Sequence, residues 1–433
     1  KLWSTQPKVS GDGQGMAVCP SLRVNGHFVR YLNYSMLRVP PIMKHRIVHN
    51  PFVTRFFQSI AFQKPRSKFW SRTVTTQGIV SASNVYSFLD KNDKENPNVI
   101  NGRAMFIDGT AIMYRAYYKL LAKLHHGHLT NADGNGDWVL TVFSALSLII
   151  DVLEFLPSHV AVAFDHDGSA FGHSFFSSKE NVLGKGTNFR HTLYPAYKSN
   201  RLPTPDTIIQ GLQYLKASIK AMSIKVIEVP GVEADDVLGT LTMRSVDAGC
   251  KVRVVSPDKD FFQILSPSVR LLRMAPRGFE MVSFGIEDFA ERYGQLQPSQ
   301  FVDVMALVGD KSDNIPGVDG IGDVHALKLI TKFGSLENLL RCLDQVEEER
   351  LRMTLGKNAE MALLSKDLAL LRSDLPFYMV PFGTDDLAFG KPEDDGEKFK
   401  SLLAAMSAYA EGFSAHPLIR RAVSLWGTLS ELT

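Results

Sequence analysis

The amino-acid sequence predicts an α/β fold, with a mostly parallel central sheet flanked by helices and a smaller helical module after it. The first observation is that short apolar runs alternate with longer segments of helical periodicity, as in strand–helix–strand units. The second is a length of 433 residues with 45% hydrophobic and 21% charged residues, enough for two or three domains with a large core. The third is that no apolar run reaches 18 residues, which argues against a membrane-spanning protein.

Charge and cysteine content narrow the class of protein further. The net charge is +3, but residues 1–95 contain fourteen Lys and Arg against four Asp and Glu, so the remainder carries −7. Any binding of nucleic acid must therefore come from local basic patches on an acidic body. The three cysteines, Cys19, Cys250 and Cys342, show neither zinc spacing nor a disulfide framework, which fits a reducing compartment.

The N-terminal segment has the composition of an organellar transit peptide. From Met36 to Leu89 there is no Asp or Glu, and eight Lys and Arg residues are mixed with Ser, Thr and Phe. A disordered basic arm that binds nucleic acid is the alternative interpretation. The polar, turn-rich stretch "LDKNDKENPNVINGR" (89–103) is interpreted as a linker. We expect an organellar protein, with the mitochondrion slightly favoured over the chloroplast by the frequent Arg and Phe.

Five apolar runs after the linker are candidate strands. They are "AMFID" (104–108), "VAVAF" (160–164), "KVIEV" (225–229), "KVRVVS" (251–256) and "VRLLRM" (269–274). Helical segments such as "VLTVFSALSLIIDVLEFL" and "TPDTIIQGLQYLKASIKAM" lie between them, and the second should start with Thr204 as N-cap and Pro205 at the first helical position. This alternation predicts a mostly parallel sheet covered on both faces.

Carboxylates follow several of these strands. Asp108 ends the first strand, Asp165 follows the second, and Asp258 and Asp260 follow the fourth in "SPDKD". A single acid after a strand usually marks only a turn or a helix cap. Because ligands of open parallel sheets bind beyond the carboxyl ends of the strands, several such acids indicate one shared site.

The stretch "GVEADDVLGTL" from Gly231 adds three acids at the start of a helix. The helix dipole offsets part of the cost of their repulsion, and Glu233 and Asp236 should share one face, with Asp235 rotated away from it. Ordinary acid enrichment at a helix N-terminus explains one or two of these acids well, but three less comfortably. A further pair, Asp310 and Asp313, follows an apolar helix in "GDKSDNIPGV".

Taken together, the acids form a candidate metal site. The nine candidate ligands are Asp108, Asp165, Glu233, Asp235, Asp236, Asp258, Asp260, Asp310 and Asp313. Carboxylates without Cys or His suit hard cations, so we expect two or more Mg²⁺ or Mn²⁺ ions. Since magnesium keeps several waters, some of these acids should act through water or orient the direct ligands. Two such ions can activate a water and stabilise the leaving oxygen of a phosphodiester.

Two further segments suit nucleic acid. In "IPGVDGIGDVHALKLITKF", Gly317, Gly320 and Gly322 form a tight turn before a helix that contains Lys328, and backbone N–H groups there could contact the phosphates of a duplex. A lone glycine turn more often marks a chain reversal. In "FRHTLYPAYKSNR", Arg190, Tyr194, Tyr197, Lys198 and Arg201 combine cations with aromatic rings, which suits a single strand. Lys198 and Arg201 should lie on a helix, and a solvated surface helix is the alternative there. Arg115, in "YRAYY", is another candidate.

These motifs together resemble a known family. The pieces "FIDGTAIMYRAYY", "VAVAFD", "YKSNR", "GVEADDVLGTL", "SPDKD" and "GDKSDNIPGVDGIG" resemble the 5′-nuclease domain of bacterial DNA polymerase I and the related phage 5′-nucleases and flap endonucleases. They occur in the family's order and cover roughly residues 101–385. The resemblance implies a PIN-like 5′-nuclease fold and a helix–three-turn–helix module, of the helix-hairpin-helix type, that grips duplex DNA.

The resemblance also implies roles for individual residues. The inner metal cluster would comprise Asp108, Asp165, Glu233, Asp235, Asp236, Asp258 and Asp260, and a further metal site would comprise Asp310 and Asp313. Lys198, Arg201 and Arg115 would be catalytic: Lys198 and Arg201 would stand at the helical gateway, where the lysine helps to organise the scissile phosphate, and Arg115 would be another phosphate contact. Arg190, Tyr197, Gly317, Gly320, Gly322 and Lys328 would contact DNA, with a K⁺ ion at the turn.

The implied activity is metal-dependent hydrolysis of DNA at 5′ ends, flaps or nicks, in organellar replication and repair. RNA primer–DNA hybrids are further implied substrates, and an organellar DNA polymerase or ligase is an implied partner. We expect a monomer without a membrane partner. The alternatives are a catalytically silent protein that binds branched DNA, in which one or more acids should be missing, and a PIN-type ribonuclease, which should lack the turn and the basic pair.

The sequence departs from the family pattern at three places. The link "HDGSAFGHSFFSSKENVLGKGTN" (166–188) is longer than usual, and the loop "HHGHLTNADGNGDW" (125–138) contains three histidines, for which a surface loop is favoured over a metal site. No polymerase or proofreading domain is expected in residues 386–433, so we expect a stand-alone, plant-type nuclease. The expected organisation is a transit peptide and linker at 1–95, a catalytic domain at 96–300, the DNA-binding module at 301–390 and a helical tail at 391–433.

Overall fold

The computed structural model describes residues 102–125, 137–166, 188–274, 281–410 and 413–432. The predicted transit peptide and nearly all of the linker therefore lie outside the described residues. Most of the histidine-containing loop and nearly all of the long link between Asp165 and Phe189 also lie outside them. No helix in the described ranges is long and apolar enough to cross a membrane.

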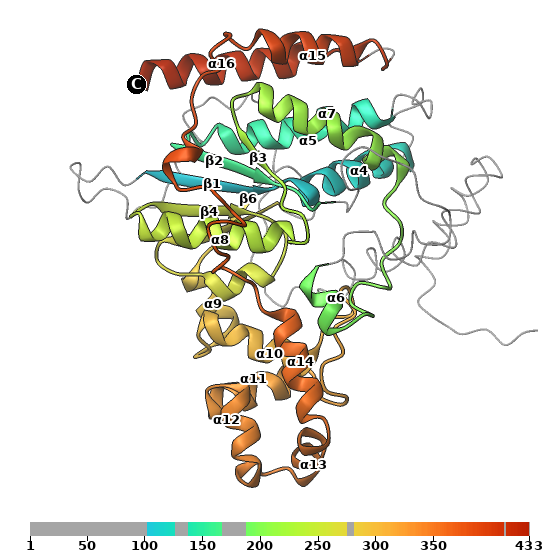
Figure 1. The fold of residues 1–433 in the computed structure, drawn as a ribbon, viewed down its shortest axis with the longest axis vertical. Coiled ribbons are helices and arrows are strands. Elements are labelled where there is room, and N and C mark those ends of the chain that lie inside the picture. Colours follow the sequence, from blue (N-terminus) through green and yellow to red (C-terminus); the bar gives the residue numbers. More distant parts are fainter. Residues whose placement is uncertain (1–101, 126–136, 167–187, 275–280, 411–412, 433) are drawn as a thin grey trace, which may run out of the picture. The chain divides into compact units, whose positions relative to one another are not determined.

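A six-stranded sheet forms the centre of the described chain (Figure 1). Its strands are β1 (Arg103–Asp108), β2 (His159–Ala163), β3 (Lys225–Ile227), β4 (Lys251–Val255), β5 (Val269–Met274) and β6 (Met281–Phe284). They are ordered β3-β2-β1-β4-β5-β6, and only the β5–β6 pair is antiparallel. The predicted parallel sheet is thereby confirmed. The short edge strand β6, with two exposed residues, was not predicted.

Helices cover both faces of this sheet (Figure 1). Helices α4 (Gly109–His125), α5 (Asp137–Leu153) and α7 (Asp206–Ala221) pack on one face, and α8 (Ala234–Asp247) packs on the other. The residues of strand β1 show that both faces of the sheet are packed, because alternate residues of a strand point to opposite faces. Ala104 and Phe106 belong to one buried cluster, whereas Met105 and Ile107 belong to the other.

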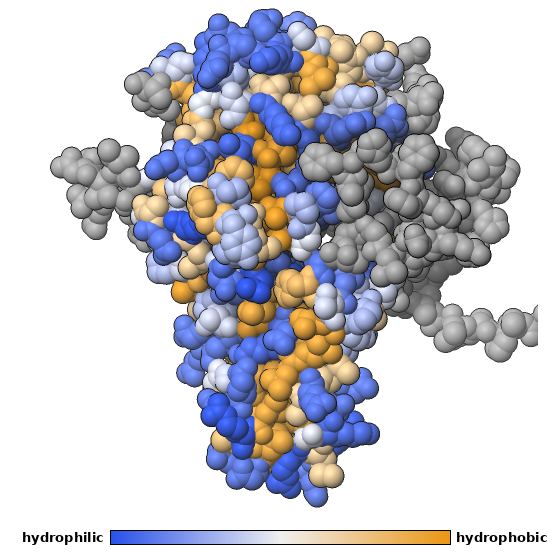
Figure 2. Space-filling view, in the orientation of Figure 1, coloured by the Kyte–Doolittle hydropathy of each residue, from blue (hydrophilic) through white to orange (hydrophobic). Residues whose placement is uncertain are grey.

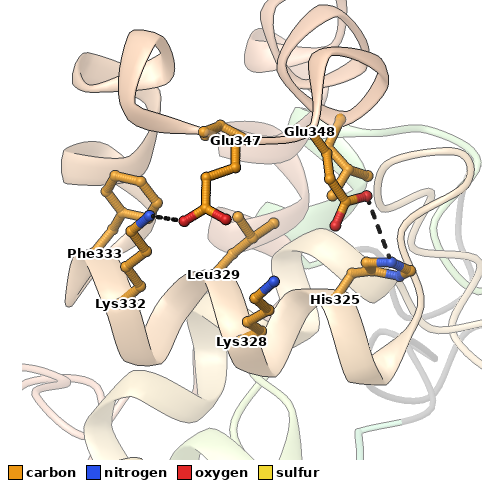
Figure 3. Close-up of a pocket in the computed structure, with 9 residues that line it drawn as sticks. His325, Lys328, Leu329, Lys332, Phe333, Glu347 and Glu348 are labelled. Carbon is orange, nitrogen blue, oxygen red and sulfur yellow. Dashed lines mark hydrogen bonds and ion pairs between the residues drawn. The ribbon is translucent and has the colours of Figure 1, made fainter.

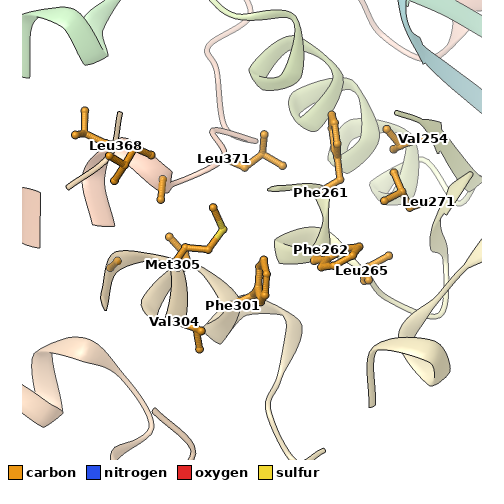
Figure 4. Packing of buried hydrophobic residues seen from close by; sticks show 14 of the residues in the cluster. Val254, Phe261, Phe262, Leu265, Leu271, Phe301, Val304, Met305, Leu368 and Leu371 are labelled. Atoms are coloured by element: carbon orange, nitrogen blue, oxygen red, sulfur yellow. The ribbon is translucent and has the colours of Figure 1, made fainter. Parts of the chain in front are cut away.

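A helical module follows the sheet. It comprises α9 (Ile286–Tyr293), α10 (Phe301–Val308), α11 (Asp323–Phe333), α12 (Leu336–Arg341), α13 (Glu349–Lys357) and α14 (Ala359–Ala369). Its core is continuous with one face of the sheet, since Phe301, Met305 and Leu371 belong to the same buried cluster as Val254 of β4 (Figure 4). In the view of Figure 2, hydrophobic residues gather over α14, where Met361 and Leu363 are partly exposed.

The C-terminal helices lie on the side of the sheet opposite the helical module. Helices α15 (Glu397–Ser407) and α16 (His416–Leu432) lie above α7 and α5 (Figure 1). Phe399 and Trp426 are buried in the cluster that contains α5 and α7. Arg421 of α16 forms ion pairs with Asp151 and Glu154 at the C-terminal end of α5.

Two local predictions were wrong. Pro205, not Thr204, is the N-cap of α7, and it provides no side-chain cap. Lys198 and Arg201 do not lie on a helix, because the only helix there is α6 (Phe189–Leu193) and residues 195–200 form turns. Lys198 has a positive φ of 54°, which breaks any regular helix at that position.

Candidate active site at the carboxyl edge of the sheet

Three neighbouring strands bring acids to one edge of the sheet. Asp108 is the last residue of β1, Asp165 lies two residues after β2, and Asp258 lies three residues after β4. Because β1 pairs with both β2 and β4 in parallel, these three carboxylates leave the sheet on the same side. The sequence-based prediction that the strand ends share a site thus agrees with the topology.

Short hydrogen bonds hold these acids in place. Asp108 Oδ1 accepts from the Ala111 N–H at 2.8 Å, and its Oδ2 accepts from Ser256 Oγ at 3.0 Å. Asp165 Oδ1 accepts from the Ala234 N–H at 2.9 Å, so the end of β2 is joined to the start of α8. Asp258 Oδ1 accepts from the Asp260 N–H at 2.9 Å, and the buried rings of Phe261 and Phe262 also hold this segment (Figure 4).

Five of these acids repel one another at this edge of the sheet, where Asp108 is buried, Asp165 is exposed, and Asp235, Asp258 and Asp260 are half-buried. Burial, helped by the nearby charges of Asp165 and Asp258, raises the pKa of Asp108 to about 7 against the opposing hydrogen bonds from Ala111 and Ser256. Burial also raises the pKa of Asp235 well above its usual range, and the charges of Asp108, Asp258 and Asp165 add to that rise. The pKa of Asp260 is raised in the same way, by burial and then by Asp258 and Asp313. We refer to Asp108, Asp165, Asp235, Asp258 and Asp260 as the inner acids.

The pH dependence of stability should report this repulsion. Because the folded-state pKa of Asp108 is about 7 against an ordinary 3.8, the folded chain binds more protons than the unfolded chain between those values. Stability should therefore rise as the pH falls from about 7 towards about 5 in the presence of EDTA. His191, whose pKa is lowered by burial, acts in the opposite sense. The informative quantity is consequently the difference in unfolding free energy between the wild type and Asp235→Asn. That difference should shrink as the pH falls. A difference that does not change with pH would contradict the repulsion among these acids.

Two of the α8 acids are engaged by a buried arginine. Arg190 of α6 donates from Nη1 to Asp236 Oδ2 at 2.6 Å and from Nη2 to Asp236 Oδ1 at 2.9 Å. Its Nη1 also donates to Glu233 Oε2 at 3.3 Å, so Glu233 and Asp236 do share one face, as the spacing predicts. Both oxygens of Asp236 thus accept hydrogen bonds from Arg190, so the chain pairs this acid with a cation of its own. Arg190 is 4% exposed and lies inside the protein, so it is not a surface contact for DNA as predicted.

A basic group lies next to these acids. Lys198 Nζ donates to Glu233 Oε1 at 2.6 Å and lies 3.7 Å from Asp313 Oδ2, while Arg201 Nη2 forms an ion pair with Asp313 Oδ1. The side chain of Arg201 is 49% exposed, whereas Lys198 is mostly covered. Tyr197 is 3% exposed and its hydroxyl donates to Glu233 and Asp313. Its ring is therefore not available to stack on a base, contrary to the prediction.

The remaining acids are paired with other donors. Asp310 Oδ2 lies 3.0 Å from Lys259 Nζ, and its Oδ1 accepts from the Ser312 N–H at 2.7 Å. We refer to Asp310 and Asp313 as the outer acids. They line a cavity of about 360 Å³, together with Arg201, Pro257, Asp258, Lys259, Asp260, Arg273 and Ser312. Sequence reasoning missed Lys259 and Arg273, although Lys259 stands between the two acids of the quoted motif "SPDKD".

The chemistry of the inner acids fits a hard divalent cation. Asp235 Oδ1 and Asp260 Oδ1 are buried and have no hydrogen-bond partner, and buried carboxylate oxygens of this kind are costly unless a cation binds them. Within the described ranges, however, no group of three or more His, Cys, Asp or Glu is arranged so that it could hold a metal ion. An ion would therefore have to draw the carboxylates together, against the repulsion that separates them.

The predicted duplex-binding turn lies between α10 and α11. Gly317 has a φ of +66° and packs against the backbone of Gly309, where a side chain would collide. It is buried, so its role is to close the turn rather than to contact a partner. Gly320, with a φ of +82°, and Gly322, the N-cap of α11, are both exposed.

Basic residues continue along α11. Figure 3 shows Lys328 between His325 and Lys332 on this helix, facing Glu347 and Glu348. Lys332 Nζ donates to Glu347 Oε1 at 2.9 Å. The exposed glycines and Lys328 thus lie on one continuous segment. Arg115 of α4 is half-buried, and burial lowers the pKa of its guanidinium.

Comparison with protein families gives two matches in succession. Residues 180–294 match the N-terminal resolvase-like domain of the 5′-3′ exonucleases, and residues 296–395 match their C-terminal SAM fold. The first range contains most of the inner acids, Lys198 and Arg201, and the second contains the outer acids and the turn before α11. Helices α15 and α16 follow the second match.

Comparison with individual proteins agrees with these matches. The chain is 37% identical over 304 residues to DNA polymerase I of Bacillus caldotenax, covering 69% of this chain and 31% of that protein. It is 37% identical over 302 residues to the thermostable DNA polymerase I of Thermus caldophilus, covering 70% of this chain and 32% of that protein. The chain thus spans about a third of the length of the curated relatives that it matches.

Solved structures with a similar chain trace include two nucleases. The T5 D15 protein co-crystallized with metal ions gives a TM-score of 0.48 at 20% identity and covers 71% of this chain and 100% of that one. The catalytic core of Rad2 in complex with a DNA substrate gives a TM-score of 0.47 at 15% identity and covers 75% of this chain and 92% of that one.

Proposed function

The chain belongs to the 5′-3′ exonuclease family, and on that premise we propose that it is a divalent-metal-dependent nuclease that hydrolyses DNA at 5′ ends and 5′ flaps. The single observation that carries this proposal is the set of inner acids, which bear unpartnered buried oxygens beside a basic group. Such a site can hold cations on one side and a phosphodiester on the other.

The inner acids would hold the first divalent ion. Asp108, Asp235, Asp258 and Asp260 are the best-placed ligands, because Asp108 is buried and the other three are half-buried beside other carboxylates. Asp165 accepts a hydrogen bond from the Ala234 N–H of α8, which suits an orienting role. The outer acids would take part in a second site. When bound, Mg²⁺ or Mn²⁺ ions would supply an activated water and stabilise the leaving oxygen.

Lys198 and Arg201 would bind the phosphate that is cleaved. Both are held against carboxylates, Lys198 by Glu233 and Arg201 by Asp313, and the mostly covered Lys198 has the less freedom. A preorganised cation stabilises the negative charge of the transition state at little reorganisation cost. Arg201 is the more exposed of the two and would meet the substrate first. Arg115 would contact a phosphate farther along the strand.

The turn before α11 would hold the duplex. Gly320 and Gly322 are exposed and let the phosphate backbone approach the first N–H groups of α11, whose dipole favours anions. Lys328 would add a phosphate contact on the same helix. These contacts read no base sequence, so the protein should position DNA by its shape. A K⁺ ion at this turn is part of the same proposal.

A cleavage assay tests the proposed function. The purified protein should release labelled products from a 5′-flap substrate and from a nicked duplex with Mg²⁺ or Mn²⁺, and none with EDTA. A blunt duplex distinguishes exonuclease from flap activity by its product lengths, and a 5′ RNA segment tests primer removal. Cleavage that persists in EDTA would exclude the metal mechanism. Tight DNA binding without any cleavage would instead support a catalytically silent binding protein.

The cellular setting is proposed from composition. The acid-free basic segment between Met36 and Leu89 supports import into an organelle, with the mitochondrion favoured over the chloroplast. An organellar DNA polymerase or ligase would then be the functional partner, because removal of a 5′ end leaves a gap or a nick. A fluorescent fusion of residues 1–95 tests the import step directly.

A further inference from the structure

We propose that Lys259 is a built-in counter-ion of the outer acids, which competes with the second divalent ion and makes metal binding sequential. This inference rests on the proposed metal-dependent function. It assigns a positioning role to a lysine that neither the motif nor the family match singles out. The consequence is that the first ion binds the inner acids tightly, whereas the second ion binds only after the Lys259 ammonium leaves Asp310.

Lys259 forms a direct ion pair with Asp310. Lys259 Nζ lies 3.0 Å from Asp310 Oδ2, and the other oxygen of Asp310 accepts from both the N–H and the hydroxyl of Ser312. Both oxygens of Asp310 are thus engaged within the chain. A divalent ion that binds Asp310 Oδ2 meets the Lys259 ammonium at the same oxygen, and the two cations repel each other.

The two sets of acids differ in the partners of their oxygens. Asp313 is also engaged on both oxygens, by Arg201 on one side and by Tyr197 and Lys198 on the other. The inner acids differ, because Asp235 Oδ1 and Asp260 Oδ1 have no hydrogen-bond partner. The chain therefore pairs the outer acids directly with its own cations, whereas the inner acids form no ion pair among the described residues.

The side chain of Lys259 is exposed, whereas the backbone beside it is held by two buried rings. Lys259 stands between Asp258 and Asp260, on a segment fixed by Phe261 and Phe262, each 1% exposed. Its side chain is nevertheless 42% exposed and borders the cavity of about 360 Å³. Rotation about its side-chain bonds would take the ammonium into water without moving the backbone. Lys259 thus has a fixed backbone position and a side-chain ammonium that can rotate away from Asp310.

Metal binding measured without DNA tests the proposal. Mn²⁺ is titrated calorimetrically into the wild type, Lys259→Met, Lys259→Arg and the control Lys311→Met, all after EDTA treatment and dialysis. Lys311 is an exposed neighbour of Asp310 that forms no ion pair within the described residues, so its variant makes the same change in charge without the contact. The wild type should show one tight and one weak class of site.

The dissociation constant of the weak class of site decides between the possible outcomes. In Lys259→Met its dissociation constant should fall by about 10-fold, equivalent to about 1.4 kcal/mol, while the tight class changes little. Lys259→Arg and Lys311→Met should resemble the wild type. Equal weak-site affinity in the wild type and Lys259→Met overturns the inference, as does an equal gain in the Lys311→Met control. Absence of Mn²⁺ binding in every protein would instead refute the proposed metal-dependent function.

Discussion

Replacement of Asp235 by asparagine should lower the rate of DNA cleavage by more than ~100-fold, whereas DNA affinity in EDTA should be retained. The expected size follows from metal sites in general, where even residues that only orient a ligand are worth ~10–100-fold. Asp235 is half-buried and feels the charges of Asp108, Asp258 and Asp165, so its replacement removes charge at the centre of the inner acids. The variant keeps the shape of the side chain and changes only its charge and one ligand atom.

Stability separates this explanation from simple misfolding. Because Asp235 is repelled by its neighbours in the absence of metal, the asparagine variant should be more stable than the wild type in EDTA. Saturating Mg²⁺ should stabilise the wild type and have much less effect on the variant. Single-turnover cleavage of a 5′-flap, filter binding and thermal unfolding measure the three quantities.

Asp247→Asn is the matched control for this experiment. It makes the same chemical change on the same helix, but Asp247 is the exposed last residue of α8. Cleavage by this control should equal that of the wild type. Near-normal turnover by Asp235→Asn would contradict the assignment of the inner acids. So would an Asp235→Asn protein less stable in EDTA than the wild type.

The position of the acids could be predicted because it follows from connectivity. All five candidate strands exist, and any acid placed after a parallel strand must emerge at the same edge of the sheet. The convergence of Asp108, Asp165 and Asp258 therefore needed no knowledge of side-chain packing. The start of α8 could be predicted for a similar reason, since its three acids occupy the N-cap and first turn.

The roles of individual side chains could not be predicted in the same way. Arg190 and Tyr197 look like surface residues in a basic, aromatic stretch, yet both are buried by contacts with residues more than thirty positions away. Lys259 was missed for the opposite reason, because its partner Asp310 belongs to another motif fifty residues later. Local sequence determines which residues are near a strand end, but tertiary contacts determine which charges pair.

Replacement of Arg190 by alanine should reduce the free energy of unfolding by ~3–5 kcal/mol, because it leaves Asp236 as a buried charge without a counter-ion. The side chain of Asp236 is 1% exposed. Besides Arg190 it accepts only the Arg372 N–H at 3.0 Å among the described residues. Arg190 also donates to the carbonyls of Leu368 and Leu370, so it joins α6 and α8 to the C-terminal end of α14. Urea unfolding of the protein in EDTA measures the loss.

Two comparisons show whether the loss of the buried Arg190–Asp236 ion pair causes this decrease in stability. Arg421→Ala removes an arginine that is also paired with two acids, but its side chain is 32% exposed, so the cost should be only ~1 kcal/mol or less. The double variant Arg190→Met with Asp236→Leu removes both charges together and should recover much of the stability lost by Arg190→Ala. This double variant can still be measured if Arg190→Ala fails to fold. If the double variant is no more stable than Arg190→Ala, the loss comes from the severed link to α14. If Arg190→Ala costs no more than Arg421→Ala, the buried pair does not stabilise this part of the fold.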